Sequence, residues 1–130
     1  MTAEHSHELL LDQVEDEFSG IFRDTTQGVY IYLDDSHWAC NERLATMLGY
    51  ASAAELHSEA TASPFLDVAV ADESQERVVD AYMNSVDNKA ASSIPVVWKK
   101  KGGGTVSTET IFVPISFQGT ALTIHFVTAV

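Results

Sequence analysis

The sequence predicts an α+β fold: a five-stranded antiparallel sheet with helices on one face, preceded by an amphipathic helix. Three observations lead to this prediction. Apolar residues recur at three- and four-residue spacing near the N-terminus, alternating strand patterns flank a helical block at about residues 41–88, and glycine-containing turns separate the last three strand patterns. The order helix, two strands, three helices, three strands favours one sheet with its helices gathered together.

The chain has the length and charge of one acidic domain. Its 130 residues suffice for one hydrophobic core and leave little room for a second. Nineteen acidic residues against seven basic ones give a formal charge of −12, which disfavours binding to nucleic acid or to an anionic membrane. Because salt screens self-repulsion, this composition suits a salt-rich cytoplasm, and we hypothesise a halophilic source.

The sequence shows neither a membrane span nor a secretion signal. No apolar run approaches the roughly 20 residues that cross a bilayer, and the N-terminus lacks a basic and then apolar leader. The expected localisation is therefore cytoplasmic. The single cysteine, Cys40, excludes an intrachain disulfide and a cysteine-rich zinc site, and we interpret it as a small buried hydrophobic residue.

Residues 1–27 are expected to form an N-terminal amphipathic helix and a connector, ahead of a domain at residues 28–130. From His7 to about Asp24 the apolar residues share one side of a helix, and acidic residues fill the other. This stripe either packs on its own domain or forms the seam of a homodimer, and we keep both interpretations. The candidate dimer residues are Leu10, Leu11, Val14, Phe18, Ile21 and Phe22.

Residues 28–50 combine a strand hairpin with a capped helix. Apolar residues alternate at positions 29–33, which indicates a strand with one face turned to a core, and residues 34–40 supply a turn and a short returning strand. Asn41 can accept hydrogen bonds from the first free N–H groups of the next helix. Gly49 suits the left-handed position at the end of that helix.

Two capping-box patterns predict the helices that follow. In the first, Ser52 precedes Glu55 by three residues, and in the second, Asp72 precedes Gln75 by the same interval. Between them, residues 60–63 suggest a loop, and Pro64 ends one helix or begins another. A short apolar segment follows it. The last helix should end near residues 87–88, with an apolar stripe made of Val78, Val79, Tyr82, Met83 and Val86.

The remainder of the chain reads as three strands. Residues 94–98, 106–117 and 121–130 are rich in β-branched and aromatic residues, and glycines lie in the two intervening turns. Pro114 lacks a backbone donor, so its strand is expected at a sheet edge or in a bulge. The face turned away from the central helices is also apolar in places, so the N-terminal helix or a partner should cover it.

The order and spacing of these motifs resemble a PAS domain, a small sensory and interaction module of signalling proteins. The matching residues are Asn41 at the helix start, Gly49-Tyr50 at its end, Ser52, and Glu55-Leu56 in the next helix. The resemblance extends over residues 28–130 and implies that the first strand lies beside the last, with a cavity between sheet and helices. Ala71 stands before Asp72 where such chains commonly have a proline, which departs from the motif.

The resemblance also implies which cofactors to test. Flavin-binding relatives use a cysteine just after an asparagine at a helix start, whereas here Cys40 precedes Asn41. Haem-binding relatives place a histidine in the long helix after the loop, and residues 73–86 contain none. We expect no covalently bound or metal cofactor. His5 and His7 are interpreted as tail residues, with a weak adventitious metal site as the alternative.

We expect a sensory or signal-relay module and not an enzyme, because no recognisable nucleophile motif is present. It would bind a small molecule or a partner such as a histidine kinase, and relay a packing change through a homodimer. The alternatives are a steroid-isomerase-like cavity enzyme, which needs a carboxylate in an apolar pocket, and a ligand-free dimerisation module. The sequence leaves open whether the chain is a stand-alone module or a fragment of a larger receptor. Candidate pocket residues are Ile31, Leu44, Met47, Leu48, Leu66, Val79, Tyr82, Met83, Ile111 and Ile124.

Overall fold

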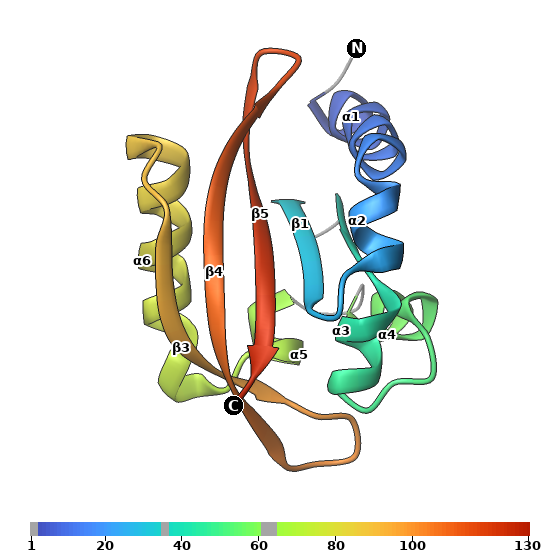
Figure 1. The fold of residues 1–130 in the computed structure, drawn as a ribbon, viewed down its shortest axis with the longest axis vertical. Helices are drawn as coiled ribbons and strands as arrows, with labels where there is room; N and C mark the ends of the chain where they lie inside the picture. Colours follow the sequence, from blue (N-terminus) through green and yellow to red (C-terminus); the bar gives the residue numbers. More distant parts are fainter. Residues whose placement is uncertain (1–2, 35–36, 61–64) are drawn as a thin grey trace.

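The computed structural model describes residues 3–34, 37–60 and 65–130, with side chains from residue 7 onward. Its strands form one antiparallel sheet in the order β2-β1-β5-β4-β3 (Figure 1). Because β1 pairs with β5, the first strand lies beside the last, as expected. The strands are β1 (Gly28–Asp34), β2 (His37–Cys40), β3 (Ser92–Lys99), β4 (Thr105–Phe117) and β5 (Thr120–Ala129).

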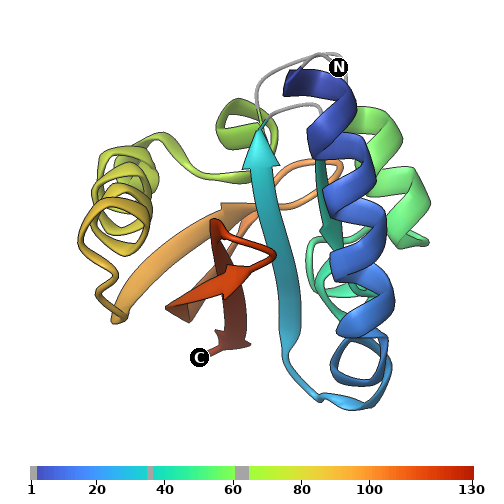
Figure 2. The same cartoon turned by 90° about the horizontal axis from the view of Figure 1, so that it is seen from above.

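Six helices accompany this sheet in the described ranges. Helices α3 to α6 contribute to the core on one face, whereas α1 packs on the opposite face, and Figure 2 shows α6 and α1 on opposite sides of β1. None of these helices is long and apolar enough to cross a bilayer. Their bounds are α1 (Ala3–Glu17), α2 (Ser19–Asp24), α3 (Glu42–Met47), α4 (Ala53–Ala60), α5 (Phe65–Ala69) and α6 (Asp72–Asn88).

Two helix predictions need correction. The single N-terminal helix is broken at Phe18, whose dihedral angles of φ −99° and ψ 13° leave the helical region, so α2 continues separately. The apolar segment after residue 64 forms the short helix α5, and its last turn passes into Val70, which bridges to Trp98 of β3. The expected turn at residues 35–36 and the loop and proline at residues 61–64 lie outside the described residues.

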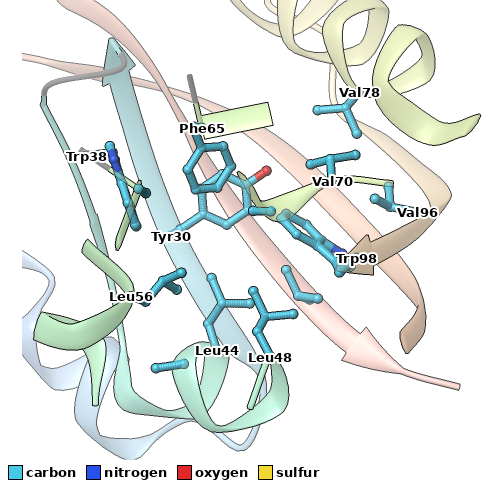
Figure 3. Packing of buried hydrophobic residues seen from close by; sticks show 14 of the residues in the cluster. Tyr30, Trp38, Leu44, Leu48, Leu56, Phe65, Val70, Val78, Val96 and Trp98 are labelled. Atoms are coloured by element: carbon cyan, nitrogen blue, oxygen red, sulfur yellow. The ribbon is translucent and has the colours of Figure 1, made fainter. Parts of the chain in front are cut away.

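Aromatic rings form the centre of the core beneath the helices. Figure 3 shows Phe65 over the ring of Tyr30, with Trp38 and Trp98 on either side. The ring centroid of Phe65 lies 5.4 Å from that of Tyr30 and 4.8 Å from that of Trp38. Burial of these large surfaces is the main stabilising contribution on this face.

A second cluster of buried residues occupies the opposite face of the sheet. Leu10 and Val14 of α1 pack there against side chains of β1 and β5. The N-terminal helix therefore covers the second apolar face, one of the two expected covers. The buried members of this cluster are Leu10, Val14, Val29, Ile31, Leu122 and Ile124.

Asn41 caps α3 as predicted, because its side-chain oxygen accepts a hydrogen bond from the Leu44 N–H at 3.0 Å. The first capping box is also present on its serine side, where Ser52 Oγ accepts the Glu55 N–H at 3.1 Å. Glu55 itself accepts from the Ala51 N–H, one residue before the expected donor. At the C-terminal end of α3, Gly49 takes the expected left-handed conformation with φ +84°.

The second capping prediction is wrong. Ala71 is the N-cap of α6 and makes no side-chain cap, and Asp72 is the first helical residue. The Gln75 side chain instead donates hydrogen bonds to the carbonyls of Leu66 and Val70, at 3.3 and 3.2 Å. Gln75 therefore bonds carbonyls at the end of α5, where the Leu66 carbonyl also accepts the Val70 N–H, rather than a free N–H of its own helix.

The buried face of α6 also differs from the predicted stripe. Val78 is buried, but Val79 and Met83 are 41% and 47% exposed. The helix turns small polar residues to the sheet, where Ser74 Oγ accepts the Val97 N–H at 3.0 Å and Ser85 Oγ bonds Thr123 Oγ1 at 2.8 Å. These hydrogen bonds to the strands fix the rotation of α6 against the sheet.

Pro114 lies where β4 has lost one neighbour. The pairing of β3 with β4 ends at the Ser92–Phe112 pair, whereas β5 continues alongside to Phe117. Pro114 is thus at a local edge, as expected.

Candidate functional site

A cavity of about 150 Å³ lies between strands β1 and β5 and helices α5 and α6. Pockets for drug-sized ligands measure about 300–1,000 Å³, so this one suits a molecule of only a few heavy atoms. Val79 is 41% exposed and also lines the cavity, which places it at the mouth. The full lining is Tyr30, Tyr32, Phe65, Leu66, Val78, Val79, Tyr82 and His125.

His125 forms a wall of this cavity and is held on three sides. Its imidazole stacks on the Tyr30 ring, with centroids 3.8 Å apart and planes 5° apart, and it meets the Phe112 ring in a T-shaped contact with centroids 4.7 Å apart. Its Nδ1 lies 3.1 Å from the Tyr30 carbonyl oxygen. Since a carbonyl only accepts, Nδ1 carries the proton and Nε2 keeps a lone pair.

The buried environment keeps the cavity side chains His125, Tyr30 and Tyr82 uncharged at neutral pH. Burial lowers the pKa of His125 to about 3, and the hydrogen bond to the Tyr30 carbonyl only partly opposes this shift. Burial also raises the pKa of the Tyr30 and Tyr82 hydroxyls. No carboxylate appears among the described lining residues. The cavity therefore favours a neutral molecule, because an ion would lose its hydration without gaining a counter-charge.

Tyr82 closes the cavity from the side of α6. Its ring meets Tyr32 edge to face, with centroids 5.5 Å apart, and its hydroxyl lies 3.5 Å from the Tyr32 carbonyl. This hydrogen bond is at the long limit. The contact between α6 and β1 at this point is thus mainly aromatic packing.

Three of the ten predicted pocket residues, Leu66, Val79 and Tyr82, line the cavity. Leu44, Leu48 and Met47 belong to the same core but lie away from the cavity lining. The remaining four residues correct the prediction: Ile31 and Ile124 pack with α1 on the other face of the sheet, and Met83 and Ile111 are 47% and 37% exposed.

Sequence reasoning missed Tyr30, Tyr32, Phe65, Val78 and His125. The alternation at positions 29–33 predicts a strand with only one face turned to a core. Both faces are buried, so the aromatic set faces the cavity and the aliphatic set faces α1. A strand with one face in solvent would carry more polar residues at the alternate positions than Tyr30, Tyr32 and His125. These residues therefore indicate that both faces of the strands are buried.

The predicted dimer residues divide into buried and exposed groups. Leu10, Leu11 and Val14 are buried, and Phe18 and Phe22 pack partly against the second cluster. Ile21 is 40% exposed. The stripe thus packs largely on its own domain, and a dimer seam stays a prediction.

Cys40 is half-buried rather than fully buried, at the end of edge strand β2. Burial raises the pKa of its thiol to about 12, and the charges of Glu42 and Glu15 add to the shift. Burial likewise raises the pKa of Glu15, which lies on α1 outside the cavity lining. A cavity enzyme of the kind considered above would need such a carboxylate inside the cavity.

No protein-family model and no curated protein matches the chain. Solved structures do match over most of its length. A PAS domain of an HTR-like protein from Haloarcula marismortui is 16% identical, covers 97% of this chain and 99% of its own, and gives a TM-score of 0.62. A PAS domain from a two-component sensor histidine kinase is 11% identical, with coverages of 92% and 99% and a TM-score of 0.61.

A third similar structure is the PAS domain, in complex with ethanol, of a LuxR-family transcriptional regulator from Burkholderia thailandensis. It is 14% identical, covers 87% of this chain and 96% of its own, and gives a TM-score of 0.62. The chain has the PAS fold, which confirms the resemblance found in the sequence.

Proposed function

We propose that this chain is a sensory signal-relay module that takes up a small, neutral, largely apolar molecule. The observation that carries the proposal is the cavity of about 150 Å³ between sheet and helices, which is lined by aromatic and aliphatic side chains. Dense packing is the norm in protein interiors, so a space of this size is a notable feature of a small domain. The PAS domains of similar fold, one of them from a sensor histidine kinase, support the same reading.

The ligand carries one hydrogen-bond donor, such as a hydroxyl group. His125 commits Nδ1–H to the Tyr30 carbonyl and keeps a lone pair on Nε2. A donor on the ligand satisfies that nitrogen, while the rings around it accept the apolar part. The similar PAS domain in complex with ethanol supports this class, because ethanol is neutral and has one hydroxyl.

The relay runs through β1 and β5. Tyr30 and His125 contact the cavity, and the next residue in β1, Ile31, packs against the cluster that includes α1. A ligand that favours one position of these strands therefore changes how α1 packs. The shift is limited to the difference in affinity for the two arrangements. Through a homodimer or a partner such as a histidine kinase, that change becomes a signal without catalysis.

The test combines ligand detection with a variant that blocks the mouth. Protein from its own host is analysed by native mass spectrometry with an absorbance spectrum, and short alcohols are then tested by ligand-observed NMR. Val79→Trp fills the mouth, whereas Met83→Trp adds the same bulk one turn further along α6, outside the cavity lining. We expect an extra small mass or saturable alcohol binding in wild type and Met83→Trp, and neither in Val79→Trp. A wild-type dimer without either would favour the ligand-free dimerisation module.

A further inference from the structure

Three residues from different elements meet at the end of β1 that faces the start of α1. Asp34 is the last residue of β1, His37 is the first of β2, and His7 lies on α1. The sequence interpretation treats His7 as a tail residue, with a weak adventitious metal site as the alternative. The structure instead brings His7 against a carboxylate 27 residues further along the chain.

One carboxylate serves both imidazoles. Asp34 Oδ2 lies 2.5 Å from His7 Nδ1, and Asp34 Oδ1 lies 2.8 Å from His37 Nδ1. The three groups offer ligand atoms that all lie within 4.8 Å of one another. The His37 side chain is only 10% exposed, while His7 and Asp34 are about one-third exposed, so the cluster is anchored inside and open on one side.

We propose that His7, Asp34 and His37 form a binding site for a divalent transition-metal ion of the zinc class. Two imidazole nitrogens and one carboxylate oxygen are ligands that Zn²⁺ and its neighbours prefer. Ligand atoms bound at about 2.0–2.2 Å to a tetrahedral ion lie about 3.3–3.6 Å apart. In the structure the Asp34 oxygens lie 2.5 and 2.8 Å from the two Nδ1 atoms, and all ligand atoms of the cluster lie within 4.8 Å of one another. The separation needed for a tetrahedral ion lies between these values. Side-chain movements of about an ångström therefore admit the ion.

The ion would stand where the two hydrogen bonds are now. Each ring binds through Nδ1 in its neutral form, with the proton on Nε2, and the fourth position is left to water. The formal charge of −12 on the chain adds a general attraction for cations. A bound ion ties α1 to the β1–β2 hairpin. Asp34 also lies two residues beyond Tyr32, which lines the cavity. A bound metal would therefore restrict the movement of β1, the strand through which the proposed signal passes.

The experiment uses the full chain after removal of metals by a chelator, titrated with Zn²⁺ in a calorimeter. We expect saturable binding of one ion per chain and a higher melting temperature with Zn²⁺, since the ion binds only the folded arrangement. His7→Gln and Asp34→Asn each remove one ligand at a partly exposed position, and both should weaken binding at least tenfold. His57→Gln is the matched control, because His57 is a partly buried histidine outside the cluster, and it should bind Zn²⁺ like wild type.

Circular dichroism of the apo variants separates lost ligands from lost folding. If both variants keep the wild-type spectrum and bind Zn²⁺ weakly, the site is established. Absence of saturable binding in wild type, or equal binding in wild type and His7→Gln, would overturn the proposal. The cluster would then only connect α1 to the β1–β2 hairpin by hydrogen bonds.

Discussion

The imidazole of His125 lies flat on the ring of Tyr30, with centroids 3.8 Å apart, while its Nδ1–H donates to the Tyr30 carbonyl. β1 and β5 are thus joined on the cavity side by a stack and a side-chain hydrogen bond in addition to the backbone ladder. The arrangement requires a neutral histidine, because a buried imidazolium would lack a counter-charge.

Protonation of His125 should therefore lower the free energy of unfolding as the pH decreases. Its pKa is about 3 in the folded protein against 6.5 ordinarily, so the unfolded chain binds the extra proton between these values. The contribution of neutral His125 to the free energy of unfolding is complete above pH 6.5 and is lost as the pH falls toward 3. Urea unfolding at pH 7.5 and 5 should show a loss about 2 kcal/mol larger in wild type than in His125→Gln. A folded-state NMR titration of His125 near pH 6.5 would contradict this expectation.

Asn41 should be among the most sensitive polar positions. Its Oδ1 accepts the N–H groups of Val29 and Leu44, and its Nδ2 donates to the carbonyls of Phe22 and Gln27. Asn41→Ala removes all four hydrogen bonds, two of them buried and two partly buried, and should cost about 2–4 kcal/mol in unfolding free energy.

The matched control for this measurement is Asn88→Ala. Asn88 is exposed, and its side chain bonds Asn84 on the same helix, so its loss should cost less than about 0.5 kcal/mol. Similar losses in the two variants would show that the junction of α2, β1 and α3 does not depend on Asn41.

Cys40 should react slowly with thiol reagents in the folded protein. Raising its pKa from 9.0 to about 12 lowers the thiolate fraction near neutral pH by about a thousandfold. Iodoacetamide labelling at pH 7.5, with and without urea, measures the ratio of the Cys40 labelling rates in the unfolded and the folded protein. A native rate close to the rate in urea would show that the thiol is solvated and not shielded by its neighbours.

A homodimer is expected to use the apolar surface left exposed near the N-terminal helices. Leu9 and Ile21 are 45% and 40% exposed there. Ile21→Glu should weaken the dimer at least tenfold in light scattering over a concentration series, because a charge would be buried at the interface. Met83→Glu changes a similarly exposed apolar residue on α6 and should leave the dimer unchanged. A wild-type monomer at high micromolar concentration would contradict the dimer itself.

The acidic composition should make stability depend on salt. The melting temperature should rise between about 0.05 M and about 2 M KCl, because salt screens repulsion among negative charges. A variant with Asp12→Asn, Asp16→Asn and Glu17→Gln removes three exposed charges from α1 and should show a smaller rise. No rise in wild type would count against a halophilic source.

The candidate site was only partly predictable because β1 is buried on both faces. Its period of two placed Tyr30 and Ile31 on opposite faces, but an alternation of two apolar sets does not say which set meets the cavity. The covering by α1 decides this, and it depends on contacts between distant parts of the chain. The rotation of α6 was likewise set by Ser74 and Ser85 bonding to strands, which a search for apolar stripes overlooks.

Local chemistry along the chain is sufficient to predict the features that depend on near neighbours. These are the order of the strands along the chain, the cap by Asn41, the left-handed turn at Gly49 and the local edge at Pro114, because each follows from backbone chemistry within a few residues. Long-range packing, in contrast, selects the side chains that line the cavity and brings His7, Asp34 and His37 together. These features depend on packing because local chemistry leaves several faces and partners equivalent.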